Sequence, residues 1–167
     1  MPIVAGDIDF RLSGGAANSD VNASLGGAKS STELVDATLH NLFDQVSGDE
    51  AQAGDTEYRC IYVHNNHGTL ALQNAEVEIQ TDTPNADSDI EIALGTSAVN
   101  GTEQSVADES TAPTGVTWES AVSTPLSIGN IPAGEHKAIW IKRVISAAAS
   151  AYNNDSAVLN VSGETAA

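Results

Sequence analysis

The sequence predicts an all-β protein whose main body is an antiparallel sandwich of two sheets. From residue 57 onward, short segments rich in β-branched and aromatic residues are separated by turn signals, such as those at 83–85 and 100–101. Residues 75–80 alternate apolar and polar side chains, which is typical of an antiparallel strand buried on one face. About seven such strands within roughly 105 residues, with no helical pattern between them, favour a sandwich of the immunoglobulin-like type.

The first 56 residues are expected to form an N-terminal arm and connecting segment, separate from the sandwich at 57–167. Ile8, Phe10 and Leu12 alternate with polar residues, which predicts a short strand. Residues 13–30 are mostly small and turn-forming, so they bury too little apolar area to become ordered alone. Fully extended, this stretch could reach about 60 Å. It is therefore either a flexible tail or an arm that becomes ordered on a neighbouring subunit.

One short helix is predicted between the arm and the sandwich. Ser30 and Glu33 have the spacing of a helix capping box. Apolar residues then recur at roughly helical intervals, at Leu34, Val35, Leu39, Leu42, Phe43 and Val46. The polar stretch 47–55 is expected to be a loop that leads into the first strand of the sandwich.

The predicted strands of the sandwich are 58–65, 69–81, 89–94, 115–119, 126–131, 136–146 and 157–162. In the strand 136–146, Ile139 and Ile141 are assigned to the core, whereas Trp140 shares the opposite face with Lys142. A tryptophan on a half-polar face is a frequent interface anchor. Alternatively, loops of the same chain cover it, and Trp118 has the same two interpretations.

Charge excludes several classes of partner. The 167 residues include 23 Asp and Glu but only 6 Lys and Arg, for a net charge of -17. Binding to nucleic-acid phosphates or to an anionic membrane needs clustered cations, so neither partner is expected. No apolar run is long enough for a membrane helix, and the first residues lack the pattern of a secretory signal. A soluble acidic protein made in a cytoplasm is the expectation.

The charges are also unevenly distributed along the chain. No Lys or Arg occurs between Arg59 and Lys137, although many Asp and Glu residues lie there. One edge or end of the sandwich should therefore carry a strongly negative field. The field suits docking onto a basic protein surface, or it only keeps the protein soluble.

No catalytic set is predicted. The single cysteine, Cys60, excludes a disulfide within the chain, and it lies roughly 13 Å from His64 along the predicted strand, too far for a nucleophile–base pair. His64 and His67 have no third metal ligand close in sequence. Weak calcium candidates are Asp82, Asp87 and Asp89, which lack the spacing of a helix-loop-helix calcium motif. We expect no enzyme activity, no cofactor and no metal.

Three stretches resemble segments of small structural proteins of tailed bacteriophages: 9–15 (DFRLSGG), 54–65 (GDTEYRCIYVHN) and 131–143 (IPAGEHKAIWIKR). The similarity covers most of the chain. It consists of packing and turn residues, so it carries over no catalytic or binding residue. The resemblance implies a head decoration or tail-associated virion component with an immunoglobulin-like domain, assembled in the host cytoplasm.

The expected function is that of a capsid decoration (cement) protein that binds the outside of the head shell through its arm and its sandwich. Its partners would be the major capsid protein or other virion proteins, and a homo-oligomer is expected. Deleting residues 1–31 should abolish shell binding and leave the sandwich folded. The alternatives are a tail or neck component and an adhesin that binds carbohydrate or a cell surface through Trp118, Trp140 or the loop 87–89. The candidate interface residues are Phe10, Arg11, Leu12, Val21, Leu25, Trp140 and Lys142.

Overall fold

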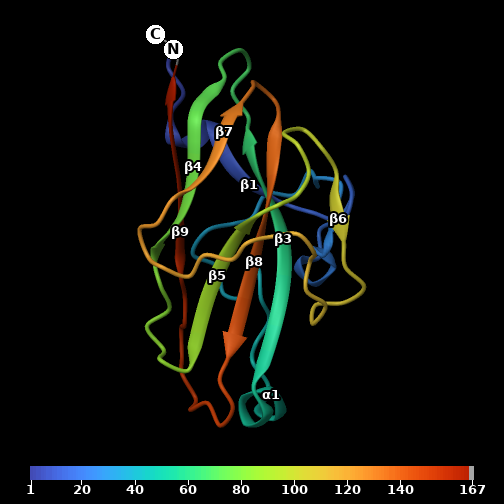
Figure 1. Cartoon of the computed structure of the whole chain (residues 1–167), viewed down its shortest axis with the longest axis vertical. Helices are drawn as coiled ribbons and strands as arrows, with labels where there is room; N and C mark the ends of the chain where they lie inside the picture. Colours follow the sequence, from blue (N-terminus) through green and yellow to red (C-terminus); the bar gives the residue numbers. More distant parts are fainter. Residues whose placement is uncertain (166–167) are drawn as a thin grey trace.

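Two antiparallel sheets face each other and form the body of the chain, which the computed structural model describes over residues 1–165 (Figure 1). The larger sheet has the order β1-β3-β8-β5, the smaller sheet has the order β7-β4-β9, and β2 pairs with β6. The predicted all-β antiparallel sandwich is therefore confirmed. The strands are β1 (Ile8–Leu12), β2 (Gly26–Gly27), β3 (Asp55–Asn65), β4 (Leu72–Thr81), β5 (Ser88–Leu94), β6 (Glu103–Ser105), β7 (Leu126–Ile131), β8 (His136–Ile145) and β9 (Val158–Thr165).

The main core lies between the two sheets. Ile61 of β3 and Ile139 and Ile141 of β8 pack in one apolar cluster with Val77 and Ile79 of β4. All five side chains are buried, which removes most of their apolar surface from water and supplies the main driving force for folding. The predicted core face of β8 is thus confirmed.

The larger sheet is buried on its outer face as well. Cys60 and Tyr62 of β3 and Trp140 of β8 form a second apolar cluster there, each with no exposed surface. Val106 and Val116, both in the chain segment that follows β6, pack against that cluster. Trp140 is therefore covered by the chain's own loops, which is the second of the two interpretations of this residue.

The N-terminal segment belongs to the sandwich and is neither a free tail nor an arm laid on a neighbour. β1 pairs with β3 in antiparallel register, and Leu12 is 2% exposed. Gly26 then approaches β6 so closely that a Cβ atom would overlap the carbonyl oxygen of Gln104, and its φ of +95° also favours glycine. The small residues that suggested flexibility allow the chain to pack closely against its own strands.

The predicted helix over the stretch that follows Ser30 is wrong. This stretch is irregular, with positive φ values at Ala37 (55°) and His40 (57°) that break a helical path. Its apolar residues Leu34, Leu42 and Phe43 instead pack against the main core. The true helix, α1 (Gly48–Ala53), lies within the predicted loop and has a capping box of its own, made by Ser47 and Glu50.

The remaining predictions differ in outcome. Six of the seven strands predicted for the sandwich are present with shifted ends, but 115–119 is not a strand: within it, Glu119 makes one isolated bridge with Ile92. The sequence did not predict β2 and β6, because two or three residues are too few to show a period. Over the described residues, no helix is both long and apolar enough to span a membrane.

Candidate functional site

Cys60 and His64 do not form a reactive pair. Cys60 is fully buried, and burial raises the pKa of its thiol, so the thiolate that a nucleophile needs is disfavoured. His64 instead faces Asp9 of β1, with 3.1 Å between its Nδ1 and the Oδ1 atom of Asp9. The Cys60 side chain packs in the second apolar cluster, and the His64 ring links β3 to β1.

The side chains considered as metal ligands accept hydrogen bonds from backbone N–H groups. The ring Nδ1 of His67 accepts hydrogen bonds from the backbone N–H groups of Thr69 and Leu70. Asp82 accepts one from the N–H of Thr83, and Asp87 accepts one from the N–H of Ser150. Among residues 1–165, no three His, Cys, Asp or Glu side chains are grouped as metal ligands would be.

Burial and like charges act together at Asp89, the third calcium candidate. Burial, followed by the neighbouring charges of Asp82 and Glu91, raises the pKa of the Asp89 carboxyl. Lys142 compensates the charge of Glu91 through an ion pair of 2.6 Å. Around Asp89, three carboxyl groups therefore face the single ammonium group of Lys142.

A buried polar cluster fixes the small β2–β6 pair on the larger sheet. The Glu103 carboxylate accepts hydrogen bonds from the N–H groups of Thr96 and Ser97 and from the Thr96 hydroxyl. Burial by itself would raise the pKa of Glu103, but these hydrogen bonds outweigh it and lower the pKa to about 2. The Tyr62 hydroxyl donates to the Gly27 carbonyl and accepts from the N–H of Glu103. Sequence patterns held no signal for this cluster, because its contacts with Tyr62 join residues 35 and 41 positions apart.

Internal contacts occupy most of the positive charges. Ion pairs join Arg11 to Asp9, Arg59 to Glu109, Arg143 to Glu57, and Lys142 to Glu91. Lys137 donates to the backbone carbonyls of Gly95 and Ser97. Five of the six Lys and Arg side chains are thus held by the fold, and the excess of acidic side chains is not neutralised.

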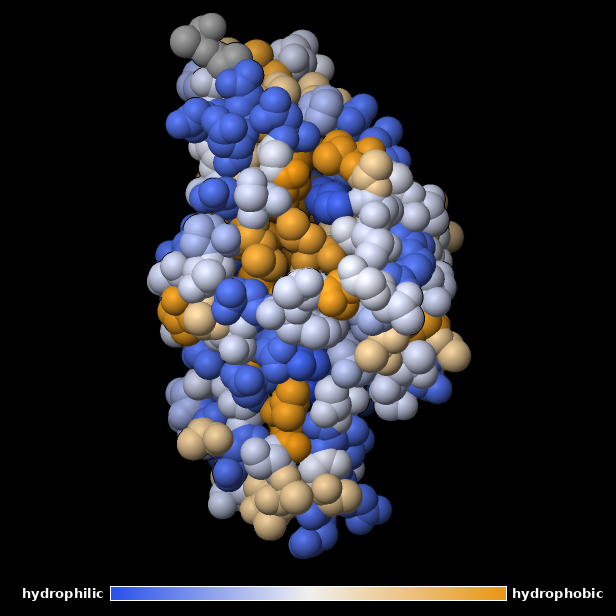
Figure 2. Space-filling view, in the orientation of Figure 1, coloured by the Kyte–Doolittle hydropathy of each residue, from blue (hydrophilic) through white to orange (hydrophobic). Residues whose placement is uncertain are grey.

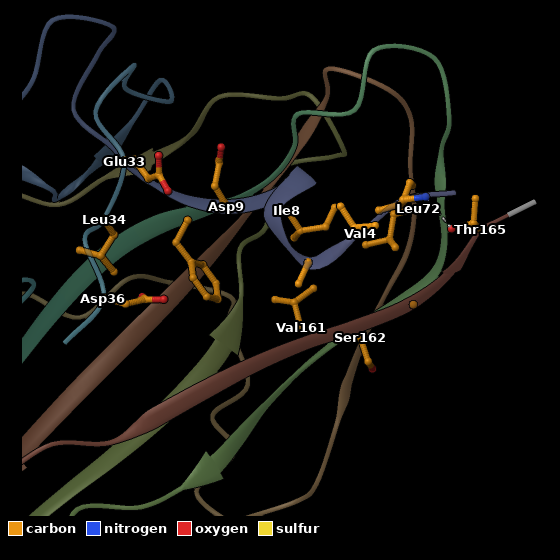
Figure 3. A pocket seen from close by; sticks show the side chains of 14 residues that line it. Val4, Ile8, Asp9, Glu33, Leu34, Asp36, Leu72, Val161, Ser162 and Thr165 are labelled. Carbon is orange, nitrogen blue, oxygen red and sulfur yellow. Dashed lines mark hydrogen bonds between the residues drawn. The ribbon is translucent and has the colours of Figure 1, made fainter. Parts of the chain in front are cut away.

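One groove of about 340 Å³ opens on the side of the sandwich where β1 and β9 approach each other. Figure 3 shows Ile8, Leu72 and Val161 bordering it, with Leu34, Glu33 and Asp36 toward the end away from Thr165. Apolar and polar side chains both line it, and the carboxylates are those of Glu33, Asp36 and Asp9, the last of which is paired with Arg11. We call this feature the β1–β9 groove.

A second groove, of about 300 Å³, opens between β5 and β7 and is lined by Leu94, Leu126 and the segment 115–119. Figure 2 shows apolar side chains gathered in a hollow along the middle of one face of the molecule. Trp118 borders this groove and is half-buried. Its ring centre lies 5.6 Å from that of Tyr58 and 5.1 Å from the Lys142 ammonium, so neighbours already contact the ring.

The candidate interface residues are mostly engaged within the chain. Phe10 and Val21 pack against the main core, Leu25 is half-buried, and Leu12 and Trp140 are buried. Arg11 and Lys142 are held in ion pairs. The two grooves are accessible concave surfaces, and the β1–β9 groove combines residues from opposite ends of the chain.

Comparisons with protein-family models, with curated proteins and with solved structures find no match. The basis for a function is therefore the chemistry of the acidic surface and of the two grooves.

Proposed function

We propose that this chain is a non-enzymatic structural protein of a tailed-phage virion that decorates the outside of the head shell. The observation that carries the proposal is the charge arrangement: the net charge is -17, and the fold already holds five of its six cationic side chains. An acidic body is repelled by packaged nucleic acid and attracted by basic patches on a protein shell. Its resemblance to phage structural proteins is the reason to look for that shell on a virion.

The architecture supports docking as a preformed body. Both faces of the larger sheet are covered, and the N-terminal segment is anchored to β3. A preformed surface loses little conformational entropy on binding. The docking surface would therefore be the surface of the folded domain. The sequence had instead predicted binding through the N-terminal arm as well.

The test is binding of the purified chain to undecorated head shells of its phage. We expect the chain to sediment with the shells at low salt and to dissociate as salt rises, because screening weakens charge pairing. Electron microscopy of the decorated shells should place the added density on the outer surface. Absence of binding at every salt concentration, or density on the tail or neck of the virion, would overturn the assignment to the head.

A carbohydrate-binding adhesin is the competing candidate, favoured by the half-buried Trp118 beside the second groove. Stacking of sugars on an aromatic ring would need this ring. A glycan array with the wild-type chain and the Trp118→Ala variant, with and without calcium, tests it. Glycan binding that is lost in the variant, together with no binding to shells, would favour the adhesin.

A further inference from the structure

We infer that the free edge of β9, with the β1–β9 groove beside it, accepts an extended segment of a partner protein as a fourth strand of the smaller sheet. The segment would alternate basic and apolar side chains. This inference rests on the proposed docking function, for which it names the contact surface and the partner's chemistry. Three observations support it: the direction of the backbone groups of β9, the covered edges of the larger sheet, and the charges near β9.

The backbone direction along β9 follows from its neighbour. The carbonyl of Ile79 accepts a 2.9 Å hydrogen bond from the N–H of Ser123, which precedes β7. In an antiparallel strand both polar groups of one residue point to the same side, so those of Ile79 point away from β9. Ile79 is in register with Leu159, and Val77 with Val161. The N–H and C=O groups of Leu159 and Val161 therefore point to the free edge.

The edges of the larger sheet are covered, in contrast to that of β9. Residues of the segment 30–34 bond to β1: the N–H of Leu34 donates to Phe10 at 2.8 Å, and that of Leu12 donates to Thr32 at 3.0 Å. Glu119 exchanges two backbone hydrogen bonds with Ile92 at the edge of β5. In the described chain, no turn, loop or cap bond of this kind reaches β9 between 158 and 164.

β9 also lacks the residues that usually protect an edge. It contains no Lys, Arg or Pro, and its one charged residue is Glu164. Val158 at its start is 45% exposed. Such an edge is a template for strand addition, in which backbone hydrogen bonds supply affinity and alternate side chains supply specificity.

The surroundings define what the added side chains should be. Side chains pointing inward would meet the apolar side chains of the β1–β9 groove, among them Ile8 and Val161. Those pointing outward would stand on the solvent face of the smaller sheet, next to Glu164 of β9 and one strand further from Glu76 and Glu78 of β4. Neither strand carries a Lys or Arg. Opposite charges on neighbouring strands stabilise a sheet and like charges destabilise it. A basic partner fits, whereas a second copy of this acidic chain would bring like charges together.

The first test uses amide hydrogen exchange measured by NMR, with a synthetic octapeptide of alternating valine and lysine as the probe. We expect saturating peptide to slow exchange at Leu159 and Val161 by about tenfold or more. Exchange at Asn160 and Ser162 should change little, because their N–H groups already point toward β4. The controls are a valine–glutamate octapeptide and a valine–lysine peptide with proline at alternate positions.

Three outcomes would overturn the inference: no change at Leu159 and Val161, equal slowing by the glutamate peptide, or slow exchange without peptide in a chain that sediments as a dimer. The last outcome would identify a second copy as the occupant.

A matched pair of surface variants links the edge to the shell. Ser162 is exposed on the outward face of β9, so both substitutions should fold. Ser162→Lys should weaken peptide binding severalfold, and Ser162→Glu should strengthen it. Reduced shell binding by Ser162→Lys would support the inference. Unchanged shell binding by Ser162→Lys would overturn it and leave the proposed function in place, whereas failure of the wild-type chain to bind shells would overturn the proposed function alone.

Discussion

The hydroxyl of Ser24 donates a 2.7 Å hydrogen bond to the carbonyl of Cys60, and the N–H of Cys60 donates a 2.8 Å bond to the carbonyl of Ser24. These residues are 36 positions apart in the chain. β1 ends at Leu12, which lies opposite Ile61 of β3. Ser24 takes over the pairing with β3 at the adjacent residue, Cys60. The N-terminal segment thereby completes the sheet that it covers.

Ser24→Ala should destabilise the fold by about 1–3 kcal/mol, because it leaves buried backbone groups without a partner. The Ser24 hydroxyl also accepts a 2.8 Å hydrogen bond from the N–H of Ser13, which the variant leaves unpaired. The free energy of unfolding in urea measures the effect. Ser19→Ala, at an exposed site, is the control, and equal stability of the two variants would contradict the prediction.

Deletion of residues 1–31 should abolish cooperative folding, in contrast to the expectation from sequence that the sandwich survives. The deletion removes β1, β2 and the bonds to Cys60, and so uncovers both the edge and the outer face of the larger sheet. Near-UV circular dichroism should lose its native signal. At pH 8 an aromatic disulfide reagent should react quickly with Cys60 in the truncated chain and slowly in the full chain, where burial raises the thiol's pKa. Native dichroism with an unreactive thiol would refute this account.

Phe43→Ala should release the segment 33–46 and cost about 2 kcal/mol of stability. The ring centre of Phe43 lies 4.8 Å from the Arg143 guanidinium and 5.4 Å from that of Arg59, so the ring contacts two cations and the main core together. Limited proteolysis should cut the variant faster within this segment. Leu39→Ala is the control, because Leu39 is 67% exposed; equal cleavage of the two variants would count against the prediction.

Acid should weaken the fold partly through Glu103. Its pKa of about 2 in the folded chain is below the ordinary value, so its carboxylate contributes stability that is present above about pH 5 and is lost as the pH falls toward 2. Glu103→Gln should be less stable at pH 7, because its amide cannot accept all of these hydrogen bonds, but it should lose less stability from pH 5 to 2.5. Denaturation midpoints across this range measure the difference, and parallel pH curves would exclude the assigned role.

The strands of the two sheets were predictable because each one alternates apolar and polar residues or is rich in β-branched ones. The alternation that placed Ile139 and Ile141 in the core operates within a few residues and needs no knowledge of the rest of the chain. The residues after Ser30 misled the same reasoning. Their apolar spacing suits a helix, but the chain follows an irregular path there. In that path, Leu34, Leu42 and Phe43 pack against the main core.

The candidate site was less predictable than the fold. The β1–β9 groove joins residues from the first 36 positions with Leu72 and the last strand, and no local pattern links them. The charge that makes a basic partner suitable was visible in the composition, but the location of the open edge was not.

The amino-acid sequence by itself determined the all-β class, most of the longer strands and the acidic character, since these depend on local periodicity and on simple counts of charge. Only the tertiary structure decided that the N-terminal segment completes its own sheet, that Trp140 is covered, and that β9 keeps a free edge. Each of these depends on which distant segments satisfy a strand's hydrogen bonds and cover its faces. Which segment takes each of these places is decided only when the whole chain packs together, because every buried backbone group needs a hydrogen-bond partner.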